Sequence, residues 1–179
     1  MTTFAVFLRG VNVGGVKVLM KDLTALLSNE GYQNVRTLLA SGNVLLQSAR
    51  QGRGELEAHC NSLLATHYGR PIPTLVFTTD EILQLAKPFA VNLPGPAAEH
   101  HCYLTLCESQ RDAQELYALA AQLTAESSIA VVGRSLCWTA RKGQSTNDAL
   151  GKLMAAQARR RVITTRNHNT LVKMAAIID

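Results

Sequence analysis

The 179-residue sequence lacks several features that would place it in a special class of protein. No stretch approaches the ~18 consecutive apolar residues of a membrane span. Its four cysteines, Cys60, Cys102, Cys107 and Cys137, have no close-pair spacing, which favours free thiols over a disulfide framework. Arg9 and Asn12 interrupt the N-terminal apolar run early, so a secretory signal is not expected. We therefore expect a cytoplasmic protein that does not enter a membrane.

Sequence motifs that would name a reaction are also missing. The chain contains neither G-x-x-x-x-G-K-[ST] nor G-x-G-x-x-G, and no G-x-S-x-G around a strained nucleophile. Aromatic residues make up 5% of the chain, without the run of glycines and aromatics by which some sheets bind RNA. The closest approach to a metal cluster is His100, His101, Cys102 and Cys107, which lack zinc-site spacing. We predict no metal site and no cofactor, and whether the protein is an enzyme stays open.

The residues that are present predict a globular protein with a substantial core. Hydrophobic residues account for 47% of the chain and charged residues for 17%, which is ordinary for a folded domain. A length of 179 residues suits one domain or two small ones.

In the first half, the hydrophobic pattern predicts the element order β-α-β-β-α-β. We expect strands at 3–8, 34–40, 44–48 and 72–77, with helices from Met20 to about Gly31 and over 54–68. A further helix starts at Thr79 and stops near Lys87 and Pro88. Pro88, Pro94, Gly95 and Pro96 then mark the clearest boundary in the chain.

The second half repeats this order without similarity of sequence. We expect strands at 101–107, 129–132, 135–139 and 161–165, and helices over 112–123, from a Ser145 or Thr146 cap to about Ala158, and over 169–178. Gly133 and Arg134 form a two-residue hairpin turn that begins with glycine, as a type II′ turn prefers. The fold class predicted is α+β, with two ferredoxin-like modules. They cover residues 1–87 and 100–179, joined by a linker at 88–99.

Three polar stretches at the ends of elements are candidate functional sites. The first, Arg9–Gly15, follows the first strand, and its glycines favour turns or close approach of a ligand. The second is the Ser41-Gly42-Asn43 turn. The third is Thr164–Thr170, where Thr164, Thr165 or Asn167 is a candidate cap of the last helix and Arg166 is not explained by capping. Residues 141–147 form a weaker fourth. Hydrogen bonding of loop side chains to nearby backbone explains much of the same pattern.

Basic residues are concentrated toward the C-terminus. From Arg134 to Asp179 there are nine lysines and arginines against two aspartates, while the whole chain carries a net charge of +5. Such asymmetry is typical of surfaces that bind nucleic acid or small anions. A solvated basic face that binds nothing is the more common explanation.

Several of these stretches together resemble one protein family. Leu8-Arg-Gly-Val-Asn-Val-Gly-Gly15, Val35-Arg36-Thr37, Ser41-Gly-Asn-Val44 and Thr164-Thr-Arg-Asn-His-Asn-Thr170 resemble, in order and spacing from end to end, the family called domain of unknown function 1697. Two positions that are often aromatic in that family are Leu38 and His168 here. The resemblance implies a bacterial-type soluble α+β protein with no established activity and no catalytic residues to carry over.

Three hypotheses of function follow, of which we favour the first. It is non-catalytic binding of an anionic, phosphate-bearing ligand between the two modules, by Arg9, Asn12, Gly14, Gly15, Asn43, Arg166 and Asn167. The second is sequence-tolerant nucleic-acid binding through Arg141, Lys142, Arg159, Arg160 and Arg161. The third is an enzyme of unknown reaction whose nucleophile or base lies in the loops, with Ser41 or His168 as candidates. The sequence leaves the oligomeric state open.

Overall fold

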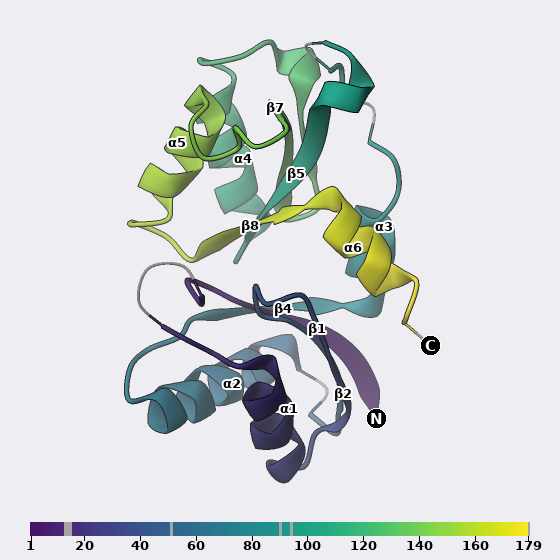
Figure 1. Ribbon diagram of the computed structural model, residues 1–179, viewed down its shortest axis with the longest axis vertical. Helices are drawn as coiled ribbons and strands as arrows, with labels where there is room; N and C mark the ends of the chain where they lie inside the picture. Colours follow the sequence, from purple (N-terminus) through teal and green to yellow (C-terminus); the bar gives the residue numbers. More distant parts are fainter. Residues whose placement is uncertain (13–15, 51, 90, 94, 179) are drawn as a thin grey trace. The chain divides into compact units, whose positions relative to one another are not determined.

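The computed structural model describes residues 1–12, 16–50, 52–89, 91–93 and 95–178. Packing divides the chain into two compact units: Met1–Gln84 with Lys173–Asp179, and Leu85–Val172. Each unit contains one four-stranded sheet, and in both sheets every neighbouring pair of strands is antiparallel (Figure 1).

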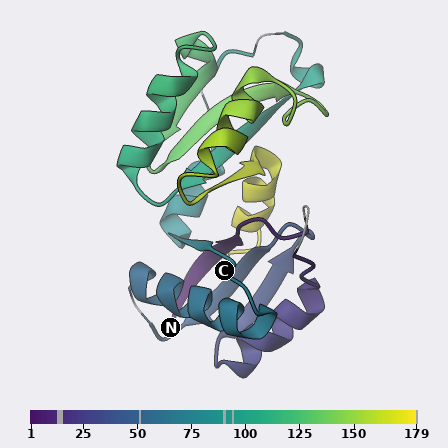
Figure 2. The same cartoon turned by 90° about the vertical axis from the view of Figure 1, so that its left-hand side faces the viewer.

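The first unit has the sheet order β2-β3-β1-β4. Its elements are β1 (Thr2–Leu8), α1 (Met20–Asn29), β2 (Gln33–Leu38), β3 (Asn43–Ser48), α2 (Arg53–Tyr68) and β4 (Thr74–Thr78), followed by α3 (Thr79–Leu85). β1 is central because it is apolar over most of its length, with every residue from Phe4 to Leu8 buried. α1 and α2 cover one face of the sheet (Figure 2), where Leu23, Leu27, Leu56 and Leu64 pack against its strands.

The second unit repeats this arrangement with the order β6-β7-β5-β8. Its elements are η1 (Ala97–Glu99), β5 (His100–Cys107), α4 (Gln110–Ala120), η2 (Glu126–Ser128), β6 (Ile129–Val132), β7 (Ser135–Arg141), α5 (Ala149–Gln157) and β8 (Ile163–Asn167), and α6 (His168–Ala175) begins in it. α4 and α5 lie on one face of this sheet (Figure 2). Leu116, Leu150 and Met154 pack there against Trp138, whose indole N–H donates to the Thr105 hydroxyl at 3.0 Å.

The predicted fold class is confirmed. Both units have the β-α-β-β-α-β order and the strand arrangement of ferredoxin-like modules. Gly133 has φ +56° while Arg134 does not have a positive φ, as expected for a type II′ turn.

Two of the local differences between expectation and structure have an identifiable physical reason. β2 ends at Leu38, two residues earlier than expected, because Leu39 adopts a positive φ of 58° and starts the turn. α5 is capped by Asp148, whose side chain accepts a hydrogen bond from the Gly151 N–H, and not by Ser145 or Thr146. A carboxylate three residues before that N–H satisfies it directly.

The division into domains at 1–87, 88–99 and 100–179 stays a prediction. The compact units separate at Leu85, and the last seven residues group with the first unit. Within the described residues, no helix has both the length and the apolar character to cross a membrane.

Candidate functional site

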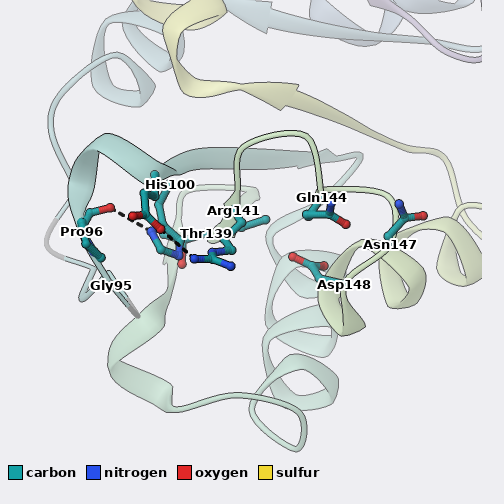
Figure 3. A pocket seen from close by; sticks show the side chains of 10 residues that line it. Gly95, Pro96, His100, Thr139, Arg141, Gln144, Asn147 and Asp148 are labelled. Atoms are coloured by element: carbon teal, nitrogen blue, oxygen red, sulfur yellow. Dashed lines mark hydrogen bonds and ion pairs between the residues drawn. The ribbon is translucent and has the colours of Figure 1, made fainter.

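A pocket in the second unit is lined by the start of β5, the end of β7 and the connection from β7 to α5. Its volume is about 580 Å³, within the range of small-molecule sites. Figure 3 shows His100, Thr139 and Arg141 on one side and Gln144, Asn147 and Asp148 on the other. Gly95, Pro96, Glu99 and Ala140 complete the lining.

The connection over residues 142–148 is held in place by backbone hydrogen bonds. The Lys142 N–H donates to the Glu99 carbonyl at 2.9 Å, and the Gln144 N–H donates to the Arg141 carbonyl at 3.0 Å. Gly143 has φ +75°, a conformation that glycine adopts without strain. This part of the pocket wall is therefore set by turns.

Gly151 allows the same connection to pack closely against α5. A Cβ atom on Gly151 would lie 1.8 Å from the Ser145 carbonyl oxygen, so only glycine fits. Glycine inside a helix costs about 1 kcal/mol relative to alanine. The close approach to Ser145 explains its presence here.

The strand side of the pocket contains an ion pair and an oriented imidazole. Arg141 contacts Glu99 at 2.8 Å through one guanidinium nitrogen, and both side chains are exposed. His100 Nδ1 lies 3.0 Å from the Pro96 carbonyl. Because a carbonyl only accepts, Nδ1 must carry a proton. A Cβ on Gly95 would lie 2.9 Å from the His100 ring. The absence of a side chain at Gly95 therefore leaves space for the imidazole.

Other polar groups at the pocket have no protein partner within the part of the chain that the structure describes. They are the side-chain amides of Gln144 and Asn147, which line the pocket, and the Lys142 ammonium. Lys142 lines a second hollow of about 390 Å³ that adjoins the pocket. The pocket can therefore offer hydrogen-bond donors and positive charge to a small molecule.

Asn12, a predicted site residue, connects backbone segments of the first unit. Its Nδ2 donates to the Val18 carbonyl at 2.9 Å and to the Ala40 carbonyl at 2.5 Å. Its Oδ1 accepts from the Val18 N–H at 2.9 Å. Both Nδ2 hydrogens and Oδ1 thus have structural partners, and its φ of 57° is one that asparagine tolerates.

Asn43 also has a structural role. It is fully buried and donates to the Leu38 carbonyl at 2.8 Å and the Ser41 hydroxyl at 2.9 Å. Gly42 before it has φ +74°, and a Cβ there would lie 2.8 Å from the Cβ of Leu8. Packing against β1 explains the Ser41-Gly42-Asn43 motif.

The remaining members of the first predicted loop are only partly described. The Arg9 N–H donates to the Pro73 carbonyl at 2.9 Å, and its side chain is half-buried. Gly14 and Gly15 lie outside the described residues.

Arg166 and Asn167 lie in the second unit, so neither unit alone contains the whole predicted set. Arg166 is buried on β8 and donates to the Thr164 hydroxyl at 2.7 Å and the Thr165 carbonyl at 2.9 Å. Burial lowers the pKa of its guanidinium to about 10, so it stays charged at neutral pH. Asn167 accepts from the Asn169 N–H at 2.9 Å, as expected for a cap of α6.

The five basic residues of the nucleic-acid hypothesis fall into two groups along the chain, one on each side of α5. Arg141 and Lys142 precede α5, and Arg159, Arg160 and Arg161 follow it. Arg161 contacts Asp112 at 3.2 Å and Glu115 at 2.9 Å, so its charge is neutralised within the unit. Nucleic-acid binding by this set stays a prediction.

The two candidate catalytic groups, Ser41 and His168, differ in their surroundings. The Ser41 hydroxyl accepts the hydrogen bond from Asn43. The His168 ring packs edge-on against Phe89 with 5.0 Å between centroids, and its Nε2 is buried without a partner among the described residues. His168 thus occupies a position where an aromatic ring also fits. No group of three or more potential metal ligands is present in the described chain.

The sequence alone predicts part of this pocket. Residues 141–147 are the weaker of its polar stretches, and Arg141 and Lys142 are among its basic candidates. Glu99 and Gly95 are not predicted, because nothing local pairs the Pro/Gly connection with the end of β7. The signal available is the antiparallel register that places His100 opposite Arg141.

Comparisons with known proteins show a similar fold in a solved structure and identify the family by a family model. The chain is similar to a solved structure described as that of the conserved bacterial protein SP0830 from Streptococcus pneumoniae. The two share 23% identity with a TM-score of 0.74, over 98% of this chain and 97% of that one. A comparison with curated proteins finds no match. The family model described as "Protein of unknown function (DUF1697)" matches residues 1–137, and the chain therefore belongs to the DUF1697 family.

Proposed function

We propose that this protein binds a small ligand carrying a phosphate or similar anionic group in the pocket of the second unit. The observation that carries the proposal is the convergence of Arg141, Lys142 and two side-chain amides, those of Gln144 and Asn147, on adjoining hollows of ligand size. The sequence also favours an anionic ligand. The pocket supports the proposal because it offers space for such a ligand in the second unit.

The charge distribution supports an anion because Arg141 is only partly engaged. Its contact with Glu99 is made through one nitrogen, which leaves its other guanidinium N–H groups without a partner among the residues described. A phosphate can take two parallel hydrogen bonds from a guanidinium. Because the Glu99 pair is exposed, it contributes little stability, and a ligand anion can replace it at small cost.

The arrangement favours binding over catalysis. Thr139 is the hydroxyl in the lining, and within the described chain no hydrogen bond joins it to His100. An activated nucleophile requires such a contact with a base. His100 instead has Nδ1 committed to Pro96, which orients Nε2 for contact with a ligand.

A thermal-shift screen of nucleotides, sugar phosphates and dicarboxylates tests this proposal. A ligand at ~100 times its dissociation constant adds about 2.7 kcal/mol, which corresponds to roughly 5–10 °C at ~2–4 °C per kcal/mol. We expect a shift in wild type that Arg141→Ala abolishes. Arg111→Ala is the matched control, because Arg111 is also an exposed arginine in the second unit, paired with a glutamate at 2.9 Å.

The same screen separates the other hypotheses. A shift lost in Arg9→Ala but kept in Arg141→Ala would place the site at the first loop. Stabilisation by short single-stranded RNA that disappears steeply with salt would favour nucleic-acid binding instead. No shift with any compound would count against the pocket as a small-molecule site.

A further inference from the structure

The structure places two free thiols in direct contact on adjacent strands of the second unit. Cys102 is on β5 and Cys137 is on β7, and their sulfurs lie 2.9 Å apart. In the strand register Cys102 is opposite Thr139 and Cys137 is opposite Leu104, so the two cysteines are diagonal neighbours on one sheet face. Diagonal neighbours can form a disulfide only where their side chains point toward each other. The short distance between these two sulfurs shows that they do.

We propose that Cys102 and Cys137 form a redox-active dithiol that low-molecular-weight disulfides convert to an intramolecular disulfide. The sulfurs need to move by less than an ångström, since a disulfide bond is ~2.05 Å long and the thiols are already 2.9 Å apart. The two residues belong to the central strands of the sheet, whose ladder spans His100–Leu106 against Ser135–Arg141. The backbone therefore holds the pair in register.

Cys102 is the thiol that attacks. It is partly exposed, whereas Cys137 is fully buried. The hydrogen bond from the Cys137 S–H lowers the pKa of Cys102, and the same bond and burial raise the pKa of Cys137. Thr139, which is directly opposite Cys102 in the strand register, lines the pocket. The partial exposure of Cys102 itself gives a reagent access to that thiol.

The reaction proceeds by two exchanges. The Cys102 thiolate attacks one sulfur of the disulfide R–S–S–R, forming a mixed disulfide and releasing one RS⁻. Cys137 then loses its proton and attacks the Cys102 sulfur, which releases the second RS⁻. The two protein thiols lose two electrons and two protons, and R–S–S–R is reduced to two thiols.

The other cysteines provide internal controls. Cys60 and Cys107 are fully buried, and burial raises the pKa of Cys60 to about 11 and that of Cys107 to about 12. Neither is expected to react, because the thiolate is the nucleophile.

Intact-mass spectrometry of the full chain after incubation with glutathione disulfide tests the proposal. Wild type is expected to lose two hydrogen atoms, and to yield a single crosslinked peptide pair containing Cys102 and Cys137. Cys137→Ser should stop at a stable glutathione adduct on Cys102, and Cys102→Ser should show neither product. Cys107→Ala should behave as wild type.

Three results would overturn the dithiol proposal. The wild-type chain could stay fully reduced, it could keep a glutathione adduct, or its crosslink could involve Cys60 or Cys107. If a variant does not fold, differential alkylation of wild type alone distinguishes the same outcomes, because it identifies which thiols have been lost.

Discussion

The side chain of Asn12 joins backbone groups that lie far apart in the sequence. Its amide contacts Val18 twice and Ala40 once, so it fixes the loop after β1 to the turn before β3. Asn12→Ala removes these hydrogen bonds. It also places alanine at a positive φ, which asparagine tolerates better. We expect unfolding free energy to fall by about 2–4 kcal/mol, measured by urea denaturation.

Asn34 is a matched control for this variant. It also has a positive φ, of 49°, but makes one exposed hydrogen bond, to Gln47. Asn34→Ala should cost about 1 kcal/mol. Asn12→Asp, which keeps the oxygen acceptor but loses both donors, should resemble Asn12→Ala. Equal losses for Asn12→Ala and Asn34→Ala would show that the cross-loop bonds contribute nothing.

Residue types at the motifs can be predicted from sequence, but their partners cannot. The sequence offers Thr164, Thr165 or Asn167 as the cap of the last helix, and Asn167 accepts the capping hydrogen bond of α6. For the amide of Asn12 the sequence allows either a ligand or the backbone as partner, because Ala40 is 28 residues away and no local pattern shows that separation.

At the level of elements, α5 and the connection before it form one structural piece. The 1.8 Å separation between a Cβ on Gly151 and the Ser145 oxygen means that Gly151→Ala must displace that connection. We expect a loss of about 1–3 kcal/mol in thermal unfolding, together with loss of ligand-induced stabilisation.

Gly54 in α2 provides the comparison. No heavy atom lies within 4 Å of a Cβ placed there, so Gly54→Ala should be neutral or stabilising by up to about 1 kcal/mol. If Gly151→Ala were equally well tolerated, that result would contradict the close packing of the Ser145 carbonyl against α5.

The ion pairs of Arg161 connect α4 to the segment before β8. Hydrogen bonds from Arg111 and Arg161 lower the pKa of Glu115. The stabilisation that this provides is complete above the unfolded-state pKa of about 4.3 and is lost as the pH falls through the lower folded-state pKa.

Arg161→Gln should therefore raise the Glu115 pKa toward its unfolded value, and stability should depend less on pH in this acid range. NMR titration of the Glu115 carboxyl measures the shift directly. An unchanged pKa in the variant would exclude Arg161 as a cause.

Element order is predictable because the hydrophobic periods of both halves are regular. The strands and helices lie within a few residues of their expected bounds. Two of the errors come from single residues that the sequence does not mark. They are Leu39, which adopts a left-handed conformation, and Asp148, which caps α5 in place of two nearby hydroxyl residues.

For the whole molecule, repetition of one module accounts for the fold. The two copies differ in the loops at the ends of their strands. In the second copy the strands β5 and β7 end beside a polar connection that forms the pocket. The whole pocket could not be predicted, because it combines residues 95–100 with residues 139–148, which the pairing of β5 with β7 brings together.

An NMR titration of the full chain with inorganic pyrophosphate tests the pocket most directly. We predict saturable shifts of the backbone amides of Glu99, His100 and residues 139–148. These shifts should be absent in Arg141→Ala and retained in Arg111→Ala. Shifts confined to Arg159 and Arg160, or no saturable shift at the pocket, would contradict the assignment of an anion site there.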